Sequence, residues 1–69
     1  MSNDELRELD REVKRLKRLA GEQAARLHDL VEERLPAAWP ELPEISQATL
    51  LACQAWAEAN ARLQVALKG

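Results

Sequence analysis

The only histidine of this 69-residue chain stands in a helical stretch among carboxylates. His28 and Glu32 are four positions apart and therefore project from one helix face, with Asp29 beside them. An imidazole with carboxylates suits a divalent ion such as nickel, zinc or iron. Two such ligands are too few for a tight site, because structural zinc uses four protein ligands. Three interpretations follow: a solvated or ion-paired His28, a weak metal site of His28, Glu32 and Asp29 shared between chains, or a direct contact of His28 with a partner.

Cys53 and Trp39 are the other residues of distinctive chemistry. Cys53 has no neighbouring histidine in the sequence and no helix N-terminus within its turn, so we predict a small packed residue rather than a reactive thiol. Trp39 either covers the end of the apolar core or stands exposed as a binding hot spot. The sequence holds no serine or cysteine nucleophile with a plausible base and no glycine-rich phosphate loop. We therefore expect a protein that is not an enzyme.

A capping box marks the start of the first element, with Ser2 as the N-cap and Glu5 three residues later. Apolar residues then recur at alternating spacings of four and three, which predicts a helix over about residues 3–34. Gly21 inside it is either tolerated, at a cost of about 1 kcal/mol, or marks the close approach of another backbone. The stripe consists of Leu6, Leu9, Val13, Leu16, Ala20, Leu27 and Leu30, with Gln23 as its one polar member.

Pro43 suits the first turn of a second helix, which we predict over about residues 43–67 after a turn at 35–42. Its inner stripe is rich in alanine: Ile45, Ala48, Ala52, Ala55, Trp56, Ala59, Leu63 and Ala66. Other apolar residues lie partly outside this stripe and predict a dimer contact or a partner site, namely Leu50, Leu51, Val65 and Leu67.

These elements predict an all-α fold with one domain over residues 1–69, an antiparallel two-helix hairpin. A chain this short buries too little apolar surface to be comfortably stable alone. We therefore expect a homodimer when the protein is free, as a four-helix bundle or rod. No stretch resembles a signal peptide or approaches the roughly 20 apolar residues of a membrane span. With its single cysteine, the chain is expected to be soluble and cytoplasmic, without membrane contact.

Charge is nearly balanced, with ten Lys plus Arg against twelve Asp plus Glu, but it is unevenly placed. A basic run in the first helix consists of Arg11, Lys14, Arg15, Lys17 and Arg18. We interpret it as a solvated face paired with Glu8 and Glu12; an acidic protein partner is the second interpretation and nucleic acid the third, because nearby carboxylates offset the charge. The end at the turn is acidic. We place a partner-binding surface there, made of Trp39, Glu32, Glu33 and Glu41 with Asp29 beside them, and of Leu50 and Leu51 on the second helix.

The segment Leu27-His28-Asp29-Leu30, with Leu35-Pro36, Trp39 and Leu42-Pro43-Glu44 after it, resembles the Rop-like small proteins encoded in nitrogen-fixation gene clusters. The resemblance covers nearly the whole chain, although family members often have Glu-Gly where this chain has Ala37-Ala38. It implies a hairpin, a dimer, association with nitrogenase or its cofactor assembly, and a metal contact through the histidine.

The function expected from this resemblance is that of a nitrogenase-associated accessory protein, which binds a nitrogenase component or a cofactor-assembly protein. Two alternatives stay open. One is a small metal-binding or metal-delivery protein that uses His28 with Glu32. The other is an RNA-binding dimer, since Rop itself binds RNA as a four-helix dimer.

Overall fold

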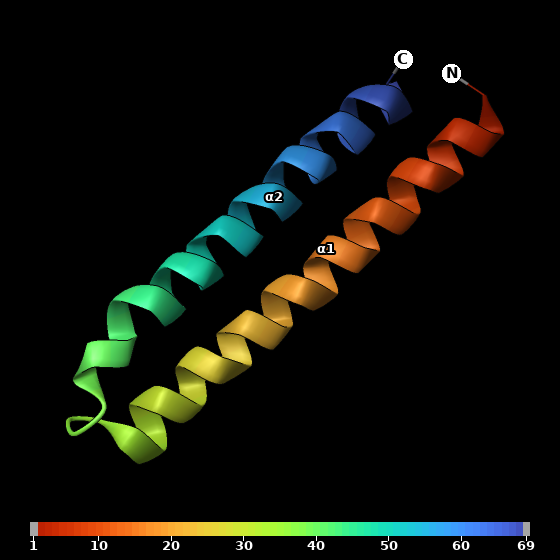
Figure 1. Ribbon diagram of the computed structural model, residues 1–69. Coiled ribbons are helices and arrows are strands. Elements are labelled where there is room, and N and C mark those ends of the chain that lie inside the picture. The colour runs from red at the N-terminus through yellow and green to blue at the C-terminus, as the bar shows by residue number, and fades with distance from the viewer. Residues whose placement is uncertain (1, 69) are drawn as a thin grey trace.

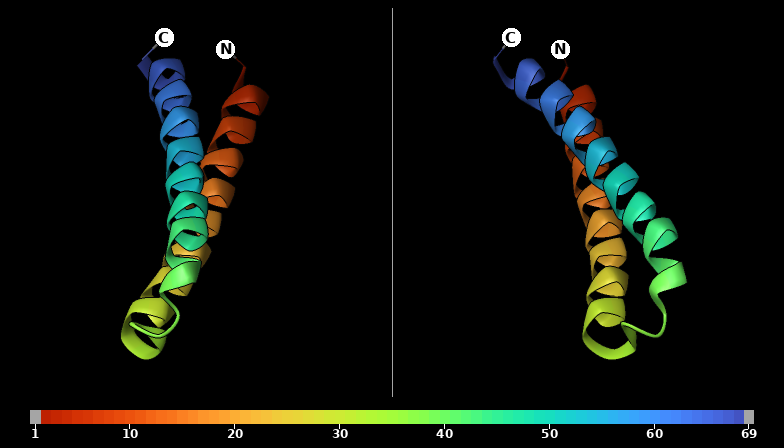
Figure 2. Two further views of the ribbon diagram at one scale, coloured as in Figure 1. Left: turned by 60° about the vertical axis from the view of Figure 1, so that its left-hand side comes forward. Right: turned by 90° about the vertical axis from the view of Figure 1, so that its left-hand side faces the viewer.

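A computed structural model describes residues 2–68 and shows two long helices side by side (Figure 1). Helix α1 spans Asn3–Asp29 and continues into a π-helical segment, η1, at Leu30–Arg34. A turn and a short 3₁₀ segment, η2 at Trp39–Glu41, lead into helix α2 at Leu42–Lys68. The helices run antiparallel and cross at a shallow angle (Figure 2), so both ends of the chain lie at one end of the rod. The rod measures 51 × 14 × 13 Å, and the predicted all-α hairpin is confirmed.

Helix α1 begins as its first residues predict. Ser2 has an extended backbone, with φ −74° and ψ 160°, and its hydroxyl accepts a hydrogen bond from the Glu5 backbone N–H at 3.2 Å. The carboxylates of Asp4 and Glu5 stand in the first turn, where they face the positive end of the helix dipole. These residues fix where the helix starts.

The core of the hairpin is a single thin row of side chains. Leu30 is fully buried near the turn, and Ile45, Ala59 and Leu63 are buried at intervals along α2. The rest of both apolar stripes is only half-buried, because one helix can cover only one side of its neighbour. The helices approach closely where Thr49 Oγ1 donates a hydrogen bond across to the Gln23 carbonyl at 3.3 Å.

The element boundaries differ in detail from the sequence prediction. Helical structure reaches Arg34, but its last turn is π-helical, with the Leu35 N–H bonded to the Leu30 carbonyl five residues back at 3.0 Å. Helix α2 starts at Leu42 instead of Pro43 and reaches Lys68, so the turn is one residue shorter than predicted. A Cβ added at Gly21 would meet nothing within 4 Å in the described part of the chain. The close-approach interpretation of Gly21 is therefore wrong within one chain.

Neither helix in residues 2–68 has both the length and the apolar character needed to cross a bilayer.

Candidate functional site

The turn between the helices is closed by hydrogen bonds at every step. Arg34 Nη1 donates to both carboxylate oxygens of Glu41, each at 3.0 Å. Inside this bridge the backbone N–H of Ala38 bonds to the Arg34 carbonyl at 2.9 Å, and that of Trp39 bonds to the Pro36 carbonyl at 3.2 Å. Charge-assisted bonds to both oxygens of a carboxylate also fix its orientation. The turn is therefore a defined structure that holds its side chains in place.

Trp39 is 66% exposed at the tip of this turn. The interpretation that it covers the core is wrong, because that place is already taken. Leu30 and Ile45 fill the last core layer, and Leu35 and Leu42 lie half-buried against the same end. The 3₁₀ segment that starts at Trp39 leaves the indole in solvent. A large aromatic side chain thus stands exposed on a fixed support.

The predicted acidic group is exposed around the closed end, but its members are not equivalent. Asp29, Glu32 and Glu33 are all exposed on the last turns of the first helical stretch. The charge of Glu41 is offset by Arg34, to which it is bonded through both oxygens. The negative field at this end therefore comes mainly from the first three residues.

The structure places each of the two predicted carboxylates near His28 but does not group the three side chains as a metal site. His28 Nε2 lies 3.9 Å from Glu32 Oε1, and His28 Nδ1 lies 3.9 Å from Asp29 Oδ1. Both distances exceed a direct hydrogen bond, and the His28 side chain is 72% exposed. Across residues 2–68, no three His, Cys, Asp or Glu side chains are grouped so that they could hold a metal ion. A metal at His28 would need ligands from outside this chain, and the geometry favours a loosely ion-paired imidazole.

Leu50 and Leu51 are half exposed on the outside of α2, as their places outside the stripe predict. Cys53 is exposed as well, so the prediction of a packed cysteine is wrong. Ala52 and Trp56 occupy the inward positions on either side of Cys53 and turn it outward. Charged residues are sparse along this helix and consist of Glu44, Glu58, Arg62 and Lys68.

Three of the five residues of the basic run form ion pairs along their own helix, among them Lys14 with Asp10 at 2.9 Å. Arg11 bonds to Glu8 at 3.0 Å, and Arg15 bonds to Glu12 at 2.6 Å, as predicted. The hydrogen bond from Arg15 lowers the pKa of Glu12, and the charge of Arg62 on α2 lowers it further. The same pair raises the pKa of Arg15. These exposed ion pairs agree with the first interpretation of the basic run, that of a solvated face.

One feature that the sequence does not predict lies at the end of the rod away from the turn. Two apolar hollows adjoin Leu9, one beside the acidic first turns of α1 and one beside Ala61 and Val65 of α2. The sequence shows the carboxylates near Leu9 on the first helix and an apolar Val65 outside the stripe of the second. That Leu9 and Val65 line neighbouring hollows depends on how the two helices pair, which the apolar periodicity does not predict.

Two amphipathic helices paired antiparallel through one fixed turn define a small helical-hairpin protein. The chain belongs to the Rop-like family, whose model matches residues 4–68. Searches of curated proteins and of solved structures returned no match.

Proposed function

We propose that this hairpin is an accessory protein that binds a larger protein through its closed end, and that this partner is a nitrogenase component or a cofactor-assembly protein. The observation that carries the proposal is the exposed Trp39 on its hydrogen-bonded turn. Tryptophan is among the residues that most often anchor interfaces. Because the turn is already ordered, little conformational entropy is lost on binding. The Rop-like family is not typically catalytic, which agrees with a binding role.

The residues around Trp39 indicate the charge and the apolar character of the surface that the partner presents. Asp29, Glu32 and Glu33 give this end a negative field, which complements a basic rim around an apolar pocket. Leu50 and Leu51 extend the contact along α2. The nitrogenase part of the proposal rests on the resemblance of the turn motif to helical hairpins encoded in nitrogen-fixation clusters.

A second copy covers one flank of the hairpin in this proposal. Side chains two positions apart on a helix point in directions that differ by about 200° around the helix axis. Leu6 therefore lies on the flank opposite Asp4, and Leu67 on the flank opposite Val65. That flank, the dimer flank, repeats small or apolar residues every seventh position, and its members are Leu6, Val13 and Ala20 on α1 and Cys53, Asn60 and Leu67 on α2. A heptad repeat on two adjacent helices is typical of a four-helix bundle.

The test is capture by immobilised hairpin of purified nitrogenase components and of a cofactor-assembly scaffold, measured by surface plasmon resonance. Trp39→Ala is expected to weaken the cognate interaction by about thirty-fold, which corresponds to a hot spot of about 2 kcal/mol. Trp39→Phe retains an aromatic anchor and is expected to lose less. Reversal of Glu32 and Glu33 to lysine is expected to slow association, with an effect that fades as salt rises.

Lys17→Glu is the matched control, because Lys17 is exposed on α1 far from the turn. It is expected to leave the affinity unchanged. If Lys17→Glu abolishes capture while Trp39→Ala has no effect, the contact lies on the basic stretch and the closed end is not the binding surface.

A further inference from the structure

The end of the rod where the chain begins carries a groove, which we name the open-end groove. Its first part is a hollow of about 410 Å³ lined by Asp4, Glu5, Glu8 and Leu9. Its second part, of about 400 Å³, is lined by Leu9 and by residues of α2, namely Ala61, Arg62, Val65 and Ala66. Both parts share Leu9, so they form one surface that crosses from α1 to α2.

Aliphatic groups form the floor of the open-end groove. Val65 is 71% exposed, more than the other large apolar side chains that the structure leaves in solvent. Leu9 is half-buried, and Ala61 and Ala66 add no bulk that would fill the space. Exposed aliphatic surface in a hollow gains free energy when side chains of a partner displace its water.

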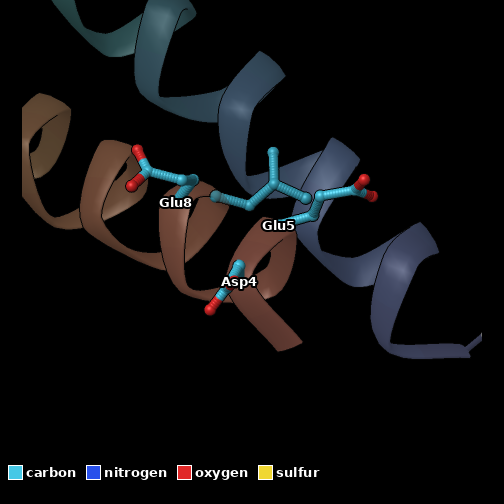
Figure 3. A pocket seen from close by; sticks show the side chains of 4 residues that line it. Asp4, Glu5 and Glu8 are labelled. Carbon is cyan, nitrogen blue, oxygen red and sulfur yellow. The ribbon is translucent and has the colours of Figure 1, made fainter. Parts of the chain in front are cut away.

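The α1 wall of the groove carries only negative charge. Figure 3 shows the carboxylates of Asp4, Glu5 and Glu8 pointing in different directions around the hollow, so they form a rim and do not converge on one ion. Glu8 also binds Arg11 at 3.0 Å. On the opposite wall, the positive charge of Arg62 acts on Glu12, the next carboxylate along α1. The rim therefore favours cationic groups along its α1 side.

The outer edges of the groove, at Asp4 and Val65, lie away from the dimer flank. Asp4 and Val65 are each two residues from members of that flank, Leu6 and Leu67, and therefore point in nearly the opposite direction. A second copy bound at Leu6 and Leu67 leaves the open-end groove uncovered. Its occupant must then be something other than that copy.

We propose that the open-end groove binds an amphipathic α-helix of a partner protein, with an apolar stripe for Leu9 and Val65 and a row of Lys or Arg beside the α1 rim. Laid between α1 and α2, this helix completes a local three-helix bundle. The walls extend over six residues of each helix, or about 8 Å, which matches about one and a half turns of the incoming helix. Its anchors are therefore apolar residues spaced i and i+3 or i+4. This surface is separate from the proposed Trp39 contact at the other end of the rod.

The first measurement uses a fluorescein-labelled synthetic helical peptide with leucines at that spacing and lysines along one edge. Fluorescence anisotropy against the full chain is expected to show saturable binding that weakens as salt is raised, because exposed charges are screened. A peptide of the same composition in scrambled order, and one with glutamate in place of lysine, are each expected to bind at least about tenfold more weakly.

The second measurement compares matched variants of the full chain. Val65→Lys places a charge and a longer side chain in the groove, and is expected to weaken peptide binding about tenfold or more. Gln54→Lys adds the same charge on the exposed surface of α2, outside both the groove and the dimer flank, and is expected to leave binding within about twofold. Asp4→Asn with Glu5→Gln is expected to flatten the salt dependence. Circular dichroism is used to verify that each variant stays helical, and Trp39→Ala is expected to bind the peptide normally even if it loses the partner of the closed end.

Two results overturn the assignment. The groove does not specifically bind an amphipathic helix if the ordered and scrambled peptides bind equally well, or if Val65→Lys binds the peptide normally. Sedimentation in which Val65→Lys, but not Leu67→Lys, dissociates a dimer means that a second copy occupies the groove.

Discussion

Trp39 and Cys53 show why single side chains are harder to place from the sequence than helices. Packing is the prediction for Cys53 and one of two interpretations of Trp39, and both side chains are exposed. For Trp39 the deciding factor is that Leu35 and Leu42 already cover the end of the core. A turn has no period, so the pattern of the sequence carries no information about which of its apolar residues points inward. Ser2 and the Arg15–Glu12 pair were predictable because their partners lie within one helical turn.

His28 is expected to matter for metal binding and little for folding. Its side chain is 72% exposed and its carboxylate neighbours are 3.9 Å away, so His28→Ala removes no core contact. We expect His28→Ala to leave the thermal midpoint nearly unchanged and to weaken any binding of Ni²⁺ or Zn²⁺ measured by calorimetric titration. In the wild type such binding is expected to weaken on acidification, because protons compete with a metal ion for the donor atoms of its ligands.

Glu22→Gln is the control for this experiment, because Glu22 is an exposed acid elsewhere on α1. Affinity that is the same in the His28→Ala variant, or that does not vary with pH, would remove the histidine from the metal site. A fall of several degrees in the melting temperature would show that His28 is buried in an assembly.

The ends of the two helices lie within a residue or so of their predicted places, because the signals that set them are local. Ser2 caps the first helix, and Pro43 lies in the first turn of α2, where a missing N–H costs nothing. The π-helical segment at Leu30–Arg34 was not predictable, since a shift of one residue in hydrogen bonding leaves the apolar pattern almost unchanged. The open-end groove was not predictable either, because it depends on contacts between the two helices, and the apolar period of each helix does not specify these contacts.

Gly21 is a removable weakness of α1. Its missing side chain faces open space, and alanine is favoured over glycine in a helix by about 1 kcal/mol. Gly21→Ala is therefore expected to raise the free energy of unfolding by about that amount and the melting temperature by about 4–8 °C, measured by calorimetry or circular dichroism.

Ala25→Gly tests the same effect in reverse, one turn later on exposed α1 surface, and is expected to lower stability by a similar amount. If Gly21→Ala instead destabilises the protein, another chain packs against that position.

The Glu12–Arg15 pair predicts how α1 responds to acid. The pKa of Glu12 is lowered in the folded protein, so the folded state holds this proton less tightly than the unfolded state does. Its contribution to stability is present above the ordinary carboxylate range and is lost as pH falls through the lowered pKa. Melting curves between about pH 6 and pH 3 are expected to depend less steeply on pH in Glu12→Gln than in the wild type, by a small margin because the pair is exposed.

Glu22→Gln serves as the comparison, because no pair involving Glu22 is seen in the described chain. An identical slope in the wild type and in Glu12→Gln would mean that the Arg15 hydrogen bond does not persist in solution.

The rod as a unit is thin for its length, at 51 × 14 × 13 Å, and only four side chains are buried in residues 2–68. So small a core offers limited stability, and association is the usual remedy. We expect sedimentation equilibrium at micromolar concentration to give the mass of two chains. Leu67→Lys is expected to shift the protein toward monomer and to lower its melting temperature, because Leu67 is an exposed member of the dimer flank that a second copy would cover.

Val65→Lys on the opposite flank is expected to leave the dimer intact. A wild-type chain that sediments as a stable, fully folded monomer would show that the hairpin needs no second copy. The mass measured by sedimentation for these variants therefore shows whether the second copy binds at the dimer flank or in the open-end groove.

The chain contains two tryptophans and no tyrosine or phenylalanine, so its near-ultraviolet absorption and emission come almost wholly from Trp39 and Trp56. One indole is in water at the turn, and the other lies half-buried between the helices, with an Nε1 that is buried and has no hydrogen-bond partner in the described residues. Emission from Trp39 should be red-shifted and open to quenching by acrylamide, and emission from Trp56 should be bluer and shielded. The unlabelled protein therefore carries two optical reporters, one for contact at the closed end and one for separation of the helices.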